Sequence, residues 1–253
     1  AVVQSCDTYF YDLGFKLGIS RMHDFLSDFS LGQPTGIDLF NESSGLLPSK
    51  EWKRAARGAT WYHGDTINAS IGQGFMLATP LQLATATAIL AHHGKQVTPT
   101  LAADALRVPP RPDVTLRNPE NWQRMEDTMA EVVHGERGTA KVMAEGAPYR
   151  MGAKTGTSQV FSVGQEETYN EDELAERLLD HALIIAFAPV EEPAIAVAVL
   201  VENGRHGGST AGPVARKVMD AWLLDDNGEL AVPPPLNRTP STRTAVTASG
   251  GTP

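Results

Sequence analysis

The stretch YRMGAKTGTSQV, from Tyr149 to Val160, decides how the rest of the chain is interpreted. It predicts an edge strand whose middle carries Lys154, Thr155, Gly156 and Thr157. The lysine supplies a cation, the two threonines supply hydroxyl donors, and the glycine lets another backbone approach closely. These groups are suited to holding a carboxylate while a peptide lies along the strand. The alternative is an ordinary solvent-facing edge strand, with Lys154 there to deter aggregation.

Composition limits the classes of protein that the chain can belong to. With 253 residues, 42% of them hydrophobic and 20% charged, it is globular for most of its length and can bury a sizeable core. The net charge of −9 argues against a nucleic-acid partner, which would require clustered cations. The longest apolar runs, 182–190 and 194–201, fall far short of the roughly 20 residues of a membrane helix. No stretch has the pattern of a signal peptide, and the single cysteine, Cys6, allows no internal disulfide.

The order of elements predicts a helix-rich α+β fold in which strands come late. The first helix is expected over 2–17, ended by Gly18, and a second runs from Ser20 to Phe29, capped by Ser20 and buried through Met22, Phe25, Leu26 and Phe29. Further helices are expected over 50–57 after a Ser49 cap, over 80–93 after Thr79-Pro80, from Asn118-Pro119, near 141–144, over 171–179 and over 213–224. Strands are expected over 96–100 and 149–160, followed by a hairpin of 181–190 and 194–203 that is buried on both faces. The tail, 225–253, has no periodicity and is predicted to be disordered.

Ser5, Cys6 and Asp7 bring a second set of reactive groups, on what the pattern predicts to be the first helix. A hydroxyl close to a carboxylate and to a lysine-bearing strand suggests a proton shuttle, and lysine is an established base for serine. The sequence here resembles the serine acyltransferases that react with penicillin, whose signature is S-x-x-K, S-x-N and K-T/S-G. Ser5-Cys6-Asp7 matches the second motif and Lys154-Thr155-Gly156 the third. IGQG (71–74) and TPLQLA (79–84) resemble class B penicillin-binding proteins, while SCDTYFY, WYHGDT, TYNEDELAERL, FAP and VENG are similar to their penicillin-binding protein 2 branch.

Two departures from this family pattern matter. Asp7 stands where the second motif usually has asparagine, and no S-x-x-K occurs, because no lysine has a serine three positions before it. The chain also begins without methionine in what looks like the inside of a helix. We therefore expect the acyl-accepting serine, its lysine base, the first sheet strands and a membrane anchor to lie upstream, so that these residues alone cannot complete the reaction.

The resemblance implies the penicillin-binding transpeptidase fold, which is serine β-lactamase-like, over residues 1–224. The implied activity is peptidoglycan D,D-transpeptidation during cell elongation: the upstream serine attacks a D-Ala-D-Ala terminus, and a second stem peptide resolves the acyl-enzyme. Ser5 would relay a proton, with Asp7 beside it, and Lys154 would tune that relay. Thr155 and Thr157 would grip the terminal carboxylate next to Gly156, and the Thr157 N–H would form one arm of the oxyanion hole. β-Lactam antibiotics would acylate the serine as substrate mimics.

Further expectations from the resemblance concern partners, location and metal. The partners would be stem peptides, an elongation-complex glycosyltransferase and membrane proteins, at the periplasmic face of the bacterial inner membrane. Cys6 would bind structural zinc together with upstream residues, or else be a buried core thiol.

Other residues leave two interpretations open. His206 could reach the site or lie in a flexible turn, and Trp61 and Tyr62 could line the cleft or plug a loop. His92 and His93 are interpreted as partners of a helix dipole. A β-lactam sensor or a non-catalytic scaffold on the same fold is the alternative function.

Overall fold

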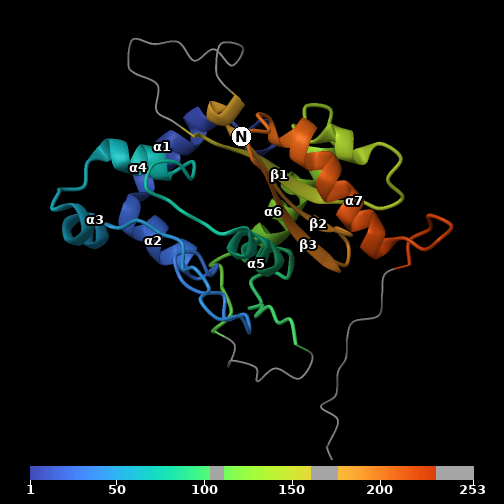
Figure 1. Ribbon diagram of the computed structural model, residues 1–253, viewed down its shortest axis with the longest axis horizontal. Helices are drawn as coiled ribbons and strands as arrows, with labels where there is room; N and C mark the ends of the chain where they lie inside the picture. The colour runs from blue at the N-terminus through green and yellow to red at the C-terminus, as the bar shows by residue number, and fades with distance from the viewer. Residues whose placement is uncertain (103–110, 161–175, 232–253) are drawn as a thin grey trace, which may run out of the picture.

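The computed structural model describes residues 1–102, 111–160 and 176–231, and its helices and strands are arranged in two parts. Figure 1 shows α1 to α4 grouped on one side of the molecule, with the sheet and α7 on the other. The helical part contains η1 (Val2–Gln4), α1 (Asp7–Leu17), α2 (Ile19–Ser27), α3 (Lys50–Arg57) and α4 (His63–Ala69). The second part contains α5 (Pro80–Ala91), α6 (Glu120–His134), η2 (Lys141–Ala144), β1 (Gly152–Ser158), η4 (Glu176–Leu178), β2 (His181–Ala188), β3 (Ile195–Val201), η5 (Gly207–Ala211) and α7 (Gly212–Leu223).

The described strands form one antiparallel sheet in the order β1-β2-β3. Within this sheet β1, which carries Lys154, is an edge strand, as the sequence predicts, and Thr155 pairs with Ile184. The predicted hairpin is also confirmed, with Ala188 opposite Ile195. Its expected burial on both faces is wrong for β3, where Leu200 is 40% exposed.

The hydrophobic core lies mainly on one face of the sheet. Ala182 and Ile184 of β2 are buried there against Met219 and Leu223 of α7, and Met143 of η2 completes the cluster. Phe187 projects to the opposite face, because neighbouring side chains of a strand alternate, and packs against α5 and α6. The sheet is therefore held between α7 on one side and α5 and α6 on the other (Figure 1).

The expected helix over 2–17 is wrong in one place that matters for function. Ser5 adopts a left-handed conformation (φ 49°, ψ 53°) between η1 and α1, and α1 begins only at Asp7. The Cys6 N–H donates to the Ala1 carbonyl (3.0 Å), which closes a tight turn instead of continuing the helix. Ser5 is thereby held just ahead of a helix N-terminus rather than on a helix face.

The second helix also differs from its prediction. α2 starts at Ile19 and is preceded by Gly18 (φ 73°), so Ser20 lies inside the helix and does not cap it. Phe29 is buried, as expected, but Phe25 is 46% exposed. The apolar periodicity correctly locates a helix here and overstates how much of its apolar face is covered.

Helix starts governed by local side-chain chemistry are confirmed. Ser49 caps α3 by accepting from the Trp52 N–H (3.1 Å), and Thr79 with Gln82 forms a capping box at the start of α5. The expected strand over 96–100 is absent from the structure, where this stretch has no regular element. Most of the predicted helix over 171–179 lies outside the described residues.

The last described residues, 225–231, fold back on the end of α7. The Asp225 N–H donates to the Glu229 carbonyl and the Ala231 N–H to the Leu223 carbonyl, so residues 225–231 form a hydrogen-bonded turn rather than the start of a disordered tail. The rest of the predicted tail lies outside the described residues. Within residues 1–102, 111–160 and 176–231, no helix combines the length and the apolar character needed to cross a membrane.

Candidate active site

A polar cleft of about 630 Å³ brings together every predicted site residue except Cys6. It lies where the start of α1, the turn after α4, strand β1 and the turn before η5 meet. Ser5 and Asp7 line one end, and Lys154, Thr155, Gly156 and Thr157 line the wall formed by β1. Segments separated by about 150 residues of sequence therefore contribute to one site.

The central contact of this cleft joins the two sequence motifs. The Lys154 ammonium donates to Ser5 Oγ at 2.6 Å and to the Thr155 carbonyl at 2.6 Å. Burial lowers the pKa of Lys154, and the Asp7 carboxylate opposes that shift. The lysine is thus fixed beside a hydroxyl, and its charged form is partly disfavoured. A group with this position and this pKa shift is suited to modulating proton transfer.

Two further contacts hold β1 in position at the cleft. The Thr155 hydroxyl is hydrogen-bonded to the Thr139 hydroxyl (3.0 Å), and Gln73 Nε2 donates to the Thr157 carbonyl (2.9 Å). Sequence reasoning missed both partners as site residues. Gln73 lies in the quoted IGQG motif, but its amide has no local signal that predicts a strand 84 residues away, and Thr139 has no recognisable signal at all.

Glycines allow the backbone to approach β1 closely. A Cβ on Gly207 would lie 2.1 Å from the Leu183 carbonyl oxygen and 2.7 Å from that of Gly156. The Cβ of a side chain at Gly156 would lie 3.3 Å from Leu183 Cβ. The start of η5 therefore lies directly against the K-T-G backbone, and His206, the residue just before η5, lines the cleft. Of the two interpretations of His206, the one that lets it reach the site is supported.

Other candidate residues lie elsewhere. Cys6 is exposed, which does not fit a buried core thiol, and among the described residues no group of three or more His, Cys, Asp or Glu side chains could hold a metal ion. Trp61 donates to the Thr66 hydroxyl (2.8 Å) and lies outside the polar cleft. His93 Nε2 lies 3.0 Å from Oε1 of buried Glu126, a side-chain partner that the interpretation of His93 as a helix-dipole partner did not include.

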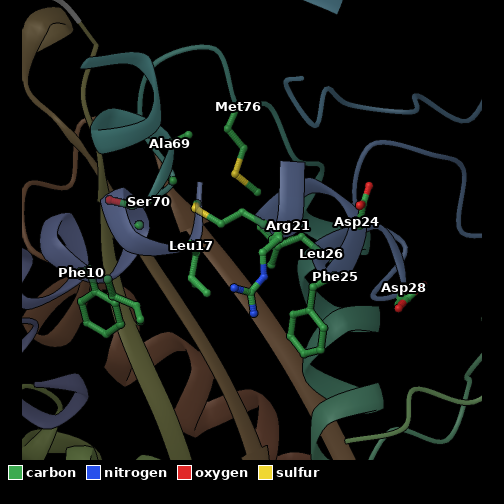
Figure 2. A pocket seen from close by; sticks show the side chains of 14 residues that line it. Phe10, Leu17, Arg21, Asp24, Phe25, Leu26, Asp28, Ala69, Ser70 and Met76 are labelled. Carbon is green, nitrogen blue, oxygen red and sulfur yellow. The ribbon is translucent and has the colours of Figure 1, made fainter. Parts of the chain in front are cut away.

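A second, mainly apolar cavity of about 890 Å³ is lined by α1 and α2. Figure 2 shows Met76 directed toward its middle, where the Arg21 guanidinium lies between Leu17 and Phe25, while Asp24 and Asp28 lie at one side. Phe25, whose burial the helical pattern predicts, lines this cavity. α1 thus has its polar N-terminus at the polar cleft and its apolar face at this second cavity.

The fold, with S-x-D at the start of α1 and K-T-G on β1, is that of a penicillin-binding transpeptidase domain. The chain belongs to the penicillin binding protein transpeptidase domain family, whose model matches residues 1–220.

Among curated relatives, it is 46% identical over 232 residues to the peptidoglycan D,D-transpeptidase MrdA of Acinetobacter baumannii, covering 88% of this chain and 34% of that protein. The MrdA of Escherichia coli K12 is 40% identical over 232 residues, covering 88% of this chain and 36% of that protein. The chain therefore spans about a third of the length of the curated relatives it matches.

Solved structures agree with this assignment. Penicillin-binding protein 2 of Pseudomonas aeruginosa, in complex with WCK 5153, is 47% identical with a TM-score of 0.82, over 91% of this chain and 50% of that one. Penicillin-binding protein 2 of Helicobacter pylori, in complex with MreC, is 32% identical with a TM-score of 0.78, over 88% of this chain and 40% of that one. These matches confirm the predicted resemblance to class B enzymes of the penicillin-binding protein 2 branch and the predicted α+β transpeptidase fold.

Proposed function

We propose that this chain is the C-terminal portion of a peptidoglycan D,D-transpeptidase domain, which cross-links stem peptides during cell elongation through a serine acyl-enzyme. The observation that carries the proposal is the 2.6 Å hydrogen bond between Lys154 and Ser5 inside a cleft walled by the K-T-G strand. It supplies a proton-relay pair next to a carboxylate-binding strand, and curated relatives named D,D-transpeptidase support the reaction class. The acyl-accepting serine is proposed to come from the part of the whole protein that precedes this chain, since S-x-x-K does not occur in it.

Each site residue has a proposed role in that reaction. Ser5 relays a proton toward the leaving amine, and Lys154 sets the electrostatics of the relay with Asp7 nearby. Thr155 and Thr157 hold the terminal carboxylate of the donor peptide, for which Gly156 leaves the backbone accessible. The Thr157 N–H supplies one arm of the oxyanion hole. The cleft geometry supports these roles because all of these groups line one cavity.

The proposal extends to domain limits, partners and location. Residues 1–224 would form the C-terminal portion of the transpeptidase domain, and the tail would lie outside it. Stem peptides and β-lactams would enter the cleft, while a glycosyltransferase and membrane proteins of the elongation complex would bind the whole protein at the periplasmic face of the inner membrane. The solved neighbour bound to MreC supports a membrane-complex partner of this kind.

Zinc binding by Cys6 is a separate and smaller proposal. Cys6 is exposed and so accessible to ligands from preceding chain. Metal analysis of the full-length protein, with the Cys6→Ser variant beside it, tests the idea. Stoichiometric zinc that is lost in the variant, with a lower Tm, supports it; equal metal content in both proteins rejects it.

The transpeptidase proposal is tested with a fluorescent penicillin and a donor peptide. The full-length protein should be labelled and should transfer the donor's acyl group to an amine acceptor, whereas residues 1–253 alone should not be labelled. Labelling of a serine within residues 1–253 would overturn the assignment of the nucleophile. Labelling of the full-length protein without any acyl transfer to amine would instead favour a β-lactam sensor.

A further inference from the structure

Asp180 is a buried carboxylate at the far end of the polar cleft that the proposed reaction does not use. The residue is among those that line the cleft and is only 8% exposed, and its buried Oδ1 atom has no hydrogen-bond partner among the described residues. Because a buried unpaired oxygen is unfavourable, such an atom in a cleft is a candidate for pairing with a donor that arrives with a ligand.

The backbone around Asp180 is held by hydrogen bonds to the turn after β3, which fix where its side chain leaves the main chain. The Asp180 carbonyl accepts from the Arg205 N–H at 2.9 Å. Asn203 secures both neighbours: its side chain donates to the Leu179 carbonyl (2.8 Å) and its N–H to His181 Nδ1 (2.9 Å). The position of the carboxylate is therefore set by the sheet and the turn after β3.

Asp180 directly precedes β2 and lines the same cleft as the threonines that are proposed to bind the carboxylate. Thr155 lies opposite Ile184 and Thr157 opposite Ala182 in the register, which ends at the pair Ser158–His181. Asp180 precedes Ala182 by two residues, so at about 3.3 Å per residue it lies roughly 7 Å beyond the Thr157 position. Lys154, opposite Ile185, belongs to the other face and points to Ser5 instead.

This spacing matches an extended peptide. If the terminal carboxylate lies at Thr155 and Thr157, the third residue from that end is about 10 Å away. The side chain of this residue therefore starts near Asp180, and a primary ammonium is the donor that best complements a carboxylate. We propose that Asp180 forms a binding subsite for an ammonium group on the third residue of the donor stem peptide, an inference that rests on the proposed transpeptidase function.

The experiment compares two donor peptides in the full-length protein. Both end in D-Ala-D-Ala; one has lysine as its third residue from the carboxyl end and the other has norleucine, which keeps the chain and lacks the charge. Acylation rates are measured for wild type, Asp180→Asn and the matched control Glu202→Gln, which removes an exposed carboxylate near the end of β3. Benzylpenicillin, which carries no ammonium, reports the integrity of the active site in each protein.

The expected result is that wild type and Glu202→Gln are acylated by the lysine peptide about 10- to 100-fold faster than by the norleucine peptide. Asp180→Asn should lose most of that preference while its rate with benzylpenicillin stays at the wild-type value. If Asp180→Asn also loses penicillin acylation, the two peptides in wild type decide: a preference for lysine supports the subsite, and equal rates overturn it.

Two other outcomes separate the possible errors. A preference for lysine that persists in Asp180→Asn overturns the assignment to this residue. A third outcome is that Asp180→Asn changes only the ratio in which the acyl-enzyme reacts with water or with an amine acceptor. That result would place the bound ammonium on the acceptor, contrary to the proposal. Absence of acylation by every peptide and by penicillin in wild type contradicts the proposed function itself rather than the subsite.

Discussion

Replacing Gly207 with alanine should disturb the K-T-G strand without touching any of its side chains. The added Cβ would lie 2.1 Å from the Leu183 carbonyl oxygen, 2.7 Å from the Gly156 carbonyl oxygen and 3.1 Å from the Gly156 nitrogen. All three are backbone atoms, so no flexible side chain can move aside. Restoring ordinary contact requires the turn and β1 to separate by on the order of 1 Å.

The magnitude follows from that displacement. Overpacking a tight interior contact costs about 1–3 kcal/mol, which for a domain of this size lowers Tm by roughly 2–12 °C. The effect on chemistry should be larger, since a shift of about 1 Å in a positioned group can reduce a rate about 100-fold. Gly207→Ala should therefore lose penicillin acylation to a greater extent than it loses folded protein.

The assay is labelling of the full-length protein with fluorescent penicillin, alongside thermal unfolding. Gly64→Ala is the matched control, because Gly64 lies in α4 and a Cβ there meets no heavy atom within 4 Å. That change should leave labelling alone and stabilise the helix by about 0.5–1 kcal/mol. A Gly207→Ala protein that melts and is labelled like wild type would refute the close approach on which the reasoning depends.

Three further changes test the site and its support. Thr157→Val should slow acylation by carboxylate-bearing β-lactams about 10- to 100-fold, with little added effect on a β-lactam whose carboxylate is esterified; equal slowing of both would remove the carboxylate-binding role. Gln82 is fully buried, and Gln82→Leu leaves one backbone N–H and two carbonyls without their partner. Urea unfolding should therefore show that the free energy of unfolding falls by about 3–5 kcal/mol. The cap variant Ser49→Ala, which serves as the comparison, should lower it by about 1 kcal/mol. His134 accepts from the Met151 N–H, and partial desolvation of its otherwise exposed ring lowers its pKa. The unfolded state gains a proton near pH ~6.5 while the folded state resists protonation, so stability should fall as the pH drops below that value. His134→Gln should flatten this part of the Tm profile.

The features that sequence predicts correctly depend on neighbours in the chain. Ser49 and Thr79 begin helices because a hydroxyl reaches a backbone N–H three residues on. The hairpin of β2 and β3 follows from two apolar runs separated by a short polar turn. The K-T-G strand is recognisable by its residue types alone, and so is its place at an edge of the described sheet.

Periodicity fails where a single residue or an outside partner decides the outcome. Apolar spacing continues smoothly through residues 2–17, but Ser5 leaves the helical conformation and so meets Lys154. The same spacing identifies the apolar face of α2 without showing that Phe25 lines an open cavity. A pattern of side chains records which face is apolar, and it carries no information about what lies against that face.

The glycine-rich turn GRHGG shows why the site itself could not be deduced from local rules. In sequence, adjacent glycines favour flexible chain, and so they favour the flexible-turn interpretation of His206. In the structure, Gly207 lies where only a residue without a Cβ fits against Gly156, so the glycine serves contact rather than freedom. The contact fixes the face of β1 that carries Thr155, while the Lys154–Ser5 hydrogen bond fixes the opposite one. The strand that defines the cleft is thus positioned from both faces by segments distant in sequence, and the geometry arises only when those segments meet.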